Sequence, residues 1–161
     1  MEIDTLLIRE VVHALKRQGL MLATAESCTG GWVAQVITSV AGSSEWFERG
    51  FVAYTNLAKR EMLGVSTTIL SRHGAVSEQC ARAMAEGALT HSHAQVALAI
   101  TGIAGPSGGT PEKAVGTVCF AWAGKKRDTL SRKQVFSGDR EAVRRQAVAA
   151  ALQGLLNYLN P

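Results

Sequence analysis

Residues 94–101 read Ala-Gln-Val-Ala-Leu-Ala-Ile-Thr, a nearly continuous apolar run. A strand that is apolar on both faces needs cover on both, which is typical of a sheet between two layers of helices. Strand and helix signals alternate before this run, and a hairpin and one long helix follow it. The sequence therefore predicts an α/β fold, a single three-layer α/β/α domain with a mixed sheet over residues 1–161.

Periodicity and capping residues locate the individual elements. We expect strands at 20–25, 50–54, 94–101, 115–123 and 129–136, the last two as an antiparallel hairpin. We expect helices at 3–18, 31–40, 57–63, 78–92 and 140–159, with a short helix ending near Arg72 and a helical turn at 45–48. The expected N-caps are Asp4, Asn56, Ser66 or Thr67, Ser77 and Asp139.

Composition excludes several classes of function. The longest apolar runs are too short to span a membrane, and the acidic start at Met1–Asp4 lacks the layout of a signal peptide. A net charge of +4 with 6% aromatic residues lacks the dense basic and aromatic stripe of a nucleic-acid binder. Three scattered cysteines (Cys28, Cys80, Cys119) argue against a disulfide framework or a zinc site. We therefore expect a cytoplasmic protein with neither nucleic acid nor membrane as its partner.

The turn at Thr24–Gly31 (TAESCTGG) joins an expected strand to an expected helix. Free backbone N–H groups at such a turn favour an anion, and its glycines let a ligand approach the backbone closely. Hydroxyls and a thiol in the same turn could supply a nucleophile. The alternative is an ordinary strand-to-helix connection in which Ser27 or Thr29 caps the helix.

Four loops at strand ends or helix starts are candidates for a ligand site: 24–31, 42–44 with 54–59, 101–106, and 136–140. In α/β sheets, ligands bind where such loops meet at the ends of strands. The glycine spacing at Thr101–Pro106 (TGIAGP) matches neither a P-loop nor the dinucleotide fingerprint.

Two cations lie where helix electrostatics disfavours them. Lys59 falls in the first turn of the helix that Asn56 would cap, and Arg140 directly follows the expected cap Asp139. The positive helix end and any burial would lower the pKa of Lys59, so that its amine could take a proton from a hydroxyl. Arg140 could hold a phosphate. The alternatives are a solvated lysine and an arginine paired with Glu141 or Glu26.

Seven motifs in this order resemble those of the CinA C-terminal-domain family, in the stand-alone form of the nicotinamide-nucleotide amidohydrolases. They are TAESCTGG at 24–31, AGSS at 41–44, GFVAYTNLAK at 50–59, GAVSE at 74–78, TGIAGP at 101–106, VGTV at 115–118 and FSGDR at 136–140. The resemblance covers about residues 5–158. It implies hydrolysis of the carboxamide of nicotinamide mononucleotide to nicotinic acid mononucleotide and ammonia, with no metal or organic cofactor.

Carried over by position, the resemblance places a serine–tyrosine–lysine group at Ser44, Tyr54 and Lys59. Ser44 is then the expected nucleophile, and Lys59 the base, directly or through Tyr54. Ser27 is the rival nucleophile and Cys28 a third candidate, although a free cysteine is more often a small buried hydrophobe. The resemblance leaves open whether a covalent intermediate forms or water attacks directly.

The resemblance also implies a substrate pocket, in which glycine turns donate to the phosphate or to the developing oxyanion. Its expected residues are Thr29, Gly30, Gly31, Thr101, Gly102, Gly105 and Arg140. Glu26 would bind ribose hydroxyls or pair with a cation.

Two other functions are compatible with these residues: a non-catalytic nucleotide-sensing module, and an amidase for another small amide. Small relatives that form dimers imply a homodimer, with Trp46-Phe47 or Trp122 as an exposed contact.

Overall fold

The structure, a computed structural model, describes residues 2–161 and contains one five-stranded sheet in the order β2-β1-β3-β4-β5. Strand β1 (Leu22–Glu26) pairs in parallel with β2 (Phe47–Val52) and with β3 (Val96–Gly102). Strands β4 (Thr117–Gly124) and β5 (Arg127–Val135) continue the sheet in antiparallel pairing. The expected mixed sheet is therefore confirmed, as is the hairpin at its edge.

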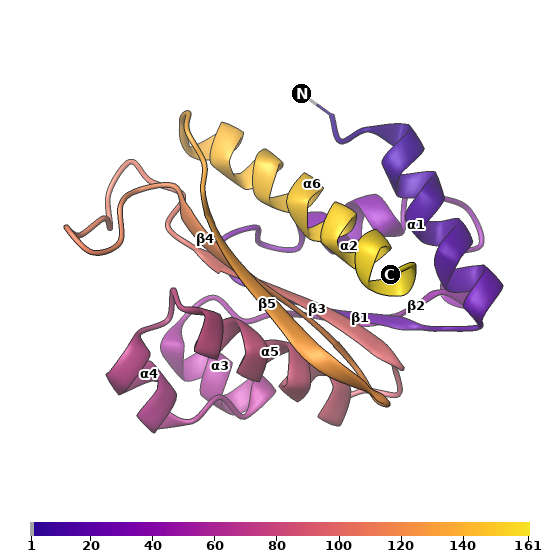
Figure 1. Ribbon diagram of the computed structural model, residues 1–161, viewed down its shortest axis with the longest axis horizontal. Coiled ribbons are helices and arrows are strands. Elements are labelled where there is room, and N and C mark those ends of the chain that lie inside the picture. Colours follow the sequence, from indigo (N-terminus) through magenta and orange to yellow (C-terminus); the bar gives the residue numbers. More distant parts are fainter. Residues whose placement is uncertain (1) are drawn as a thin grey trace.

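Helices cover both faces of this sheet (Figure 1). On one face lie α1 (Thr5–Gln18), α2 (Trp32–Ile37) and α6 (Arg140–Leu159). On the other lie α3 (Asn56–Leu63), α4 (Thr67–His73) and α5 (Glu78–Thr90). This arrangement confirms the three-layer α/β/α fold class.

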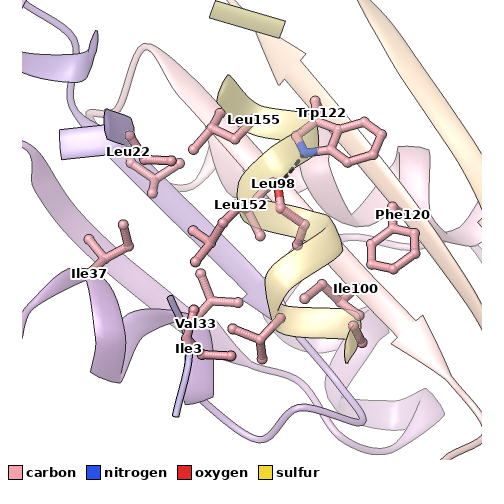
Figure 2. Close-up of a cluster of buried hydrophobic side chains, with 14 of the residues drawn as sticks. Ile3, Leu22, Val33, Ile37, Leu98, Ile100, Phe120, Trp122, Leu152 and Leu155 are labelled. Carbon is pink, nitrogen blue, oxygen red and sulfur yellow. Dashed lines mark hydrogen bonds between the residues drawn. The ribbon is translucent and has the colours of Figure 1, made fainter. Parts of the chain in front are cut away.

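The two faces of the sheet are packed with side chains of different size. Along β3, Leu98 and Ile100 face the α1/α2/α6 layer, where they meet Leu152 and other large side chains (Figure 2). Burial of each such side chain stabilises the fold by roughly 1.5–3 kcal/mol. The alternate β3 residues Ala97 and Ala99 face the other layer, whose core is built mostly of alanines.

Small residues on the α5 side allow backbones to approach closely. A Cβ at Gly87 of α5 would lie 2.0 Å from the carbonyl oxygen of Leu63, the last residue of α3. Position 87 therefore holds α3 and α5 in direct backbone contact, and any larger residue there would push them apart.

Two tryptophans expected on the surface are instead part of the core. Trp46 is 1% exposed and Trp122 is 4% exposed, so neither offers the expected contact for a second copy. The indole of Trp122 donates a hydrogen bond of 3.0 Å to the carbonyl of Ala151 on α6 (Figure 2). A buried indole needs such a polar partner, which explains its position beside the helix backbone.

Local capping signals located most helix starts. The side chains of Asp4, Ser66, Ser77 and Asp139 accept hydrogen bonds from the first turns of α1, α4, α5 and α6, as expected. For α3 the cap is Thr55, which accepts from the N–H of Ala58, and not Asn56.

Two elements near the first turn differ from the expectation. Helix α2 ends at Ile37, three residues early, and Gly42 precedes a 3₁₀ turn at Ser43–Glu45. Strand β2 begins at Phe47, within the expected helical turn at 45–48, because Phe47 pairs with Leu22 of β1. Sheet pairing overrides local helical preference there.

Within residues 2–161, no helix is long and apolar enough to cross a membrane. Cys28, Cys80 and Cys119 are buried and free.

Candidate active site

A cavity of about 290 Å³ opens at the carboxyl ends of β1 and β3. Ser27 follows β1 directly, Thr101 and Gly102 end β3, and Tyr54 lies just beyond β2. Parallel strands point their carboxyl ends to the same edge of a sheet, which is where α/β proteins bind ligands. Helix α6 closes the cavity with Arg140.

Lys59 is a buried lysine that lines this cavity. Its side chain is 2% exposed, and its Nζ donates hydrogen bonds to Ser27 Oγ at 3.0 Å and to the Tyr54 carbonyl at 3.1 Å. Burial lowers the pKa of Lys59 below its ordinary value, since desolvation disfavours the ammonium form. Among residues 2–161 no carboxylate forms a salt bridge with it. The expectation of a solvated lysine is therefore wrong.

Ser27 is held against this amine. Its N–H donates to the Ile100 carbonyl of β3 at 3.0 Å, and its Oγ donates to the Tyr54 carbonyl at 3.3 Å while it accepts from Lys59. The hydroxyl and the amine thus share one acceptor. A serine hydroxyl in contact with a lysine of lowered pKa has the geometry of an activated nucleophile and its base.

Glu26 has a different place from the one expected. Its carboxylate is 1% exposed and accepts from Thr29 Oγ1 at 2.6 Å and from the N–H groups of Val33 and Ala34. It therefore binds the start of α2, and faces neither ribose nor a cation. The amides at the start of α2 thus bind the carboxylate of Glu26, and not the anion of a ligand.

The rest of the turn consequently lies away from the cavity. Thr29 is fully buried against Glu26, and Gly30 and Gly31 are outside the residues that line the cavity. Gly31, and neither Ser27 nor Thr29, is the N-cap residue of α2. The expected free amides for a ligand phosphate are thus not offered by the α2 end of this turn.

Arg140, the first residue of α6, spans the mouth of the cavity. Its guanidinium donates to the Gly105 carbonyl and to the Tyr54 hydroxyl, both at 2.9 Å. The expected alternative, an ion pair with Glu26, is wrong because both oxygens of Glu26 bind elsewhere. The Tyr54 hydroxyl accepts from Arg140, whereas its main-chain carbonyl accepts from Lys59 and Ser27.

The loop after β3 forms one wall. Thr101 is 1% exposed and donates from Oγ1 to the Ala75 carbonyl at 2.9 Å. A Cβ at Gly102 would lie 2.8 Å from a methyl of Val118, and Gly105 has φ +84°. Glycine is needed at both positions, at the first for space and at the second for conformation. Both glycines and Thr101 line the cavity.

Ser44 is not brought to this cavity. It is exposed in the 3₁₀ turn before β2, beside the start of β1, where Phe47 pairs with Leu22. Ser27 lies beyond the other end of β1, and at about 3.3 Å per residue the two ends of the strand are roughly 13 Å apart. The expected grouping of Ser44 with Tyr54 and Lys59 is therefore not assembled, and the rival Ser27 occupies that position.

Cys28 also lines the cavity, but burial raises the pKa of its thiol to about 11. A thiol with that pKa stays protonated near neutral pH and is a poor nucleophile.

Arg144 contacts the turn that carries Ser27, a contact that sequence reasoning missed. It lies one helical turn after Arg140 and donates from Nε to the Cys28 carbonyl at 3.0 Å and from a terminal nitrogen to the Thr29 carbonyl at 3.4 Å. The i, i+4 spacing of the two arginines was the available signal, because it places both on one face of α6.

Residues 2–161 contain no group of three or more His, Cys, Asp or Glu side chains that could hold a metal ion.

The chain matches the CinA C-terminal domain over residues 4–159. It is 58% identical to nicotinamide-nucleotide amidohydrolase PncC of Escherichia coli (strain K12), over 92% of this chain and 90% of that protein. It is 51% identical to the PncC protein of Pseudomonas putida, over 96% of this chain and 95% of that one. Its fold is similar to the crystal structure of competence/damage inducible protein CihA from Agrobacterium tumefaciens, with TM-score 0.94 and 44% identity over 100% of this chain and 99% of the other.

Proposed function

Because this chain belongs to the CinA C-terminal domain family, we propose that it hydrolyses the carboxamide of nicotinamide mononucleotide, giving nicotinic acid mononucleotide and ammonia. Relatives from Escherichia coli and Pseudomonas putida, 51–58% identical over nearly all of their length, are named nicotinamide-nucleotide amidohydrolases. The observation that carries the proposal is the 3.0 Å contact between Lys59 Nζ and Ser27 Oγ inside a cavity.

In the proposed reaction, Ser27 is the nucleophile and Lys59 the general base. The neutral amine of Lys59 takes the hydroxyl proton of Ser27, and Oγ forms a bond to the carboxamide carbon. The tetrahedral intermediate collapses as the C–N bond breaks, and Lys59 returns the proton to the leaving nitrogen, which departs as ammonia. Water then attacks the Ser27 ester with Lys59 again as base, which releases the carboxylate product and restores the serine.

Tyr54 serves this step through its main chain. Its carbonyl accepts from both Lys59 and Ser27, and so holds the two reacting groups side by side. Proton transfer between them then requires only a rotation of the serine hydroxyl from this carbonyl to the amine. Proton transfer is therefore direct, and is not relayed through the Tyr54 hydroxyl as expected.

Arg140 is proposed to bind the phosphate of the nucleotide. It lines the same cavity as Lys59, two of its N–H groups are used by Gly105 and Tyr54, and a guanidinium has five. The remaining donors can hold a phosphate with charge-assisted hydrogen bonds. Thr101 and Gly102 are proposed to form the wall against which the pyridine ring lies.

The decisive experiment is to incubate the purified protein with nicotinamide mononucleotide and no added metal. We expect ammonia and nicotinic acid mononucleotide in equal amounts. Turnover of free nicotinamide at a comparable kcat/KM would indicate an amidase for small amides, because Arg140 contributes only when a phosphate is present. Binding without turnover would indicate a nucleotide-sensing module.

We further propose that the enzyme acts in the cytoplasm as a homodimer. Three free, buried cysteines are compatible with a reducing compartment. Light scattering on the purified protein measures the oligomeric state directly.

A further inference from the structure

Asn56 is a polar residue of the cavity lining whose side chain the fold itself does not use. It is the first residue of α3, and the cap of this helix is Thr55. The Asn56 amide is therefore not needed to satisfy the backbone of the first turn. Among residues 2–161 its side chain makes no hydrogen bond, and it is exposed while lining the same cavity as Ser27 and Lys59. Its donors and its acceptor are free for a molecule in the cavity.

The start of α3 lies beside the serine–lysine pair. Side chains on an α-helix point back toward its N-terminus, and the amine of Lys59 accordingly reaches the carbonyl of Tyr54, at 3.1 Å. Tyr54 precedes Asn56 by two residues, so their Cα atoms are at most about 7.6 Å apart. Asn56 and Lys59 are also neighbours on the helix surface, since residues at i and i+3 have about 5–6 Å between their Cβ atoms. Asn56 thus lies at the end of the cavity that holds Ser27 and Lys59.

Other polar side chains of the lining are already paired or lie elsewhere. The hydroxyl of Thr101 donates to a main-chain carbonyl, and that of Tyr54 accepts from Arg140. Ser107 makes no hydrogen bond within the described chain, but it belongs to the loop whose backbone holds Arg140, on the side proposed for the phosphate. Asn56 is therefore the lining residue best placed to bind the group that is hydrolysed.

The chemistry of asparagine fits that group. Its side chain is a primary carboxamide, with an acceptor oxygen and two N–H donors in one plane. Two carboxamides can pair through two parallel hydrogen bonds, in which an N–H of each donates to the oxygen of the other. An ionised carboxylate has no N–H and would bring a second oxygen against the oxygen of Asn56. An asparagine at this place can therefore distinguish a carboxamide substrate from a carboxylate product.

We propose that Asn56 binds the carboxamide of the substrate: its Nδ2 donates to the carboxamide oxygen, and its Oδ1 accepts from the carboxamide N–H. The identity of the nucleotide rests on the proposed function. When Ser27 Oγ bonds to the carboxamide carbon, that oxygen becomes negatively charged, and the hydrogen bond from Nδ2 strengthens. Loss of one side-chain donor to such an oxyanion typically lowers kcat on the order of 10²-fold or more.

The kinetic test compares Asn56→Leu with Leu57→Ala. Leucine has nearly the shape of asparagine without its polar atoms. Leu57 is the next residue of α3, is 56% exposed and is outside the cavity lining, so it is a matched control for a change on the helix surface. We expect Asn56→Leu to lower kcat/KM for nicotinamide mononucleotide on the order of 10²-fold, mostly through kcat. We expect the control to leave it unchanged. If Asn56→Leu does not fold, Asn56→Ala takes its place.

A binding test needs no turnover. In a Ser27→Ala protein, which lacks the proposed nucleophile, isothermal titration calorimetry gives the Kd of nicotinamide mononucleotide and that of nicotinic acid mononucleotide at one pH. The ratio of the two values measures the preference for the amide over the acid. We expect Asn56→Leu in this background to shift that ratio about tenfold toward the acid, and Leu57→Ala to leave it unchanged.

The outcomes separate this inference from the proposed function. An unchanged ratio of Kd values would overturn the inference, as would full kcat/KM in Asn56→Leu. In both cases a wild-type protein that releases ammonia from the mononucleotide keeps the proposed function. If the wild type releases none, the proposed function fails, and the shift in the ratio alone decides the role of Asn56. A protein that binds neither nucleotide would overturn both.

Discussion

The amine of Lys59 and the hydroxyl of Ser27 lie 3.0 Å apart and share the Tyr54 carbonyl as a hydrogen-bond acceptor. Both side chains are buried, and among residues 2–161 no carboxylate forms a salt bridge with Lys59. In the proposed reaction, the pair would gain reactivity from desolvation of the lysine, and not from a neighbouring acid as in a serine–histidine–aspartate triad.

Lys59→Met should abolish most activity while leaving the protein folded. A positioned general base contributes typically 10²- to 10⁴-fold, so kcat should fall by at least about 10²-fold. Methionine fills much of the space of the lysine stem without a charge to desolvate, so the free energy of unfolding should stay equal or rise. Steady-state kinetics and denaturant unfolding measure the two quantities. A variant that keeps its full kcat would exclude Lys59 as the base.

The reaction should respond to pH through the same amine. Because burial lowers the pKa of Lys59 below its ordinary value of 10.5, kcat/KM should rise with pH and level off below pH 10.5. This rise of kcat/KM with pH should be absent from the residual activity of Lys59→Met. A wild-type profile that does not change with pH through this range would contradict the assignment.

The free energy of unfolding should also depend on the protonation of Lys59. The unfolded chain binds a proton at Lys59 that the folded chain holds more weakly, so folding releases protons between the lowered pKa and 10.5. Stability of the wild type relative to Lys59→Met should therefore rise with pH across that window. Paired urea titrations at several pH values measure this difference.

Ser27→Ala and Ser44→Ala provide a matched pair of serine substitutions. Ser27→Ala should lose nearly all turnover, because the alanine methyl cannot attack the carboxamide. Ser44→Ala should keep it, because Ser44 is exposed at the other end of the sheet. Hydroxylamine should intercept the Ser27 ester and yield a hydroxamate, detected by mass spectrometry. Full activity in Ser27→Ala would reverse the assignment.

Arg140→Ala should act mainly on binding. Loss of a guanidinium that holds the phosphate should raise KM for the mononucleotide by roughly 10- to 100-fold, since charge-assisted hydrogen bonds contribute about 1.5–3 kcal/mol each. Any slow turnover of free nicotinamide should be unaffected. Equal defects toward both substrates would remove Arg140 from phosphate binding.

Glu26→Ala should destabilise the fold. It leaves the Thr29 hydroxyl and the buried N–H of Val33 without their acceptor, at a cost of at least about 2 kcal/mol in the free energy of unfolding. Glu26→Gln keeps one carbonyl oxygen for these donors and should cost less. Urea unfolding monitored by circular dichroism measures both.

Features that depend on neighbouring residues were predictable from the sequence. The last helix was expected at 140–159 and runs from Arg140 to Leu159, with Asp139 as its cap. Lys59 and Arg140 stood out because they oppose local helix electrostatics, and the structure places both at one cavity.

Features that depend on how distant parts of the chain come together were predicted less well. Ser44 and Ser27 both lie in loops beside strands, but Ser44 precedes β2 whereas Ser27 follows β1, so the two lie at opposite edges of the parallel pair. Glu26 resembled a ligand-binding acid because its partners Val33 and Ala34 reach it only when the turn folds back on itself.

The close contact between Gly87 and Leu63 affects the position of Lys59, which lies on the same helix as Leu63. Lys59 lies one helical turn before Leu63 on α3, so the depth at which α3 rests against α5 sets how far its amine extends toward Ser27. We expect a methyl added at position 87 to push α3 away from α5 and to lengthen the hydrogen bond between Lys59 Nζ and Ser27 Oγ. A residue outside the cavity lining would thus set the distance between the two groups proposed as base and nucleophile.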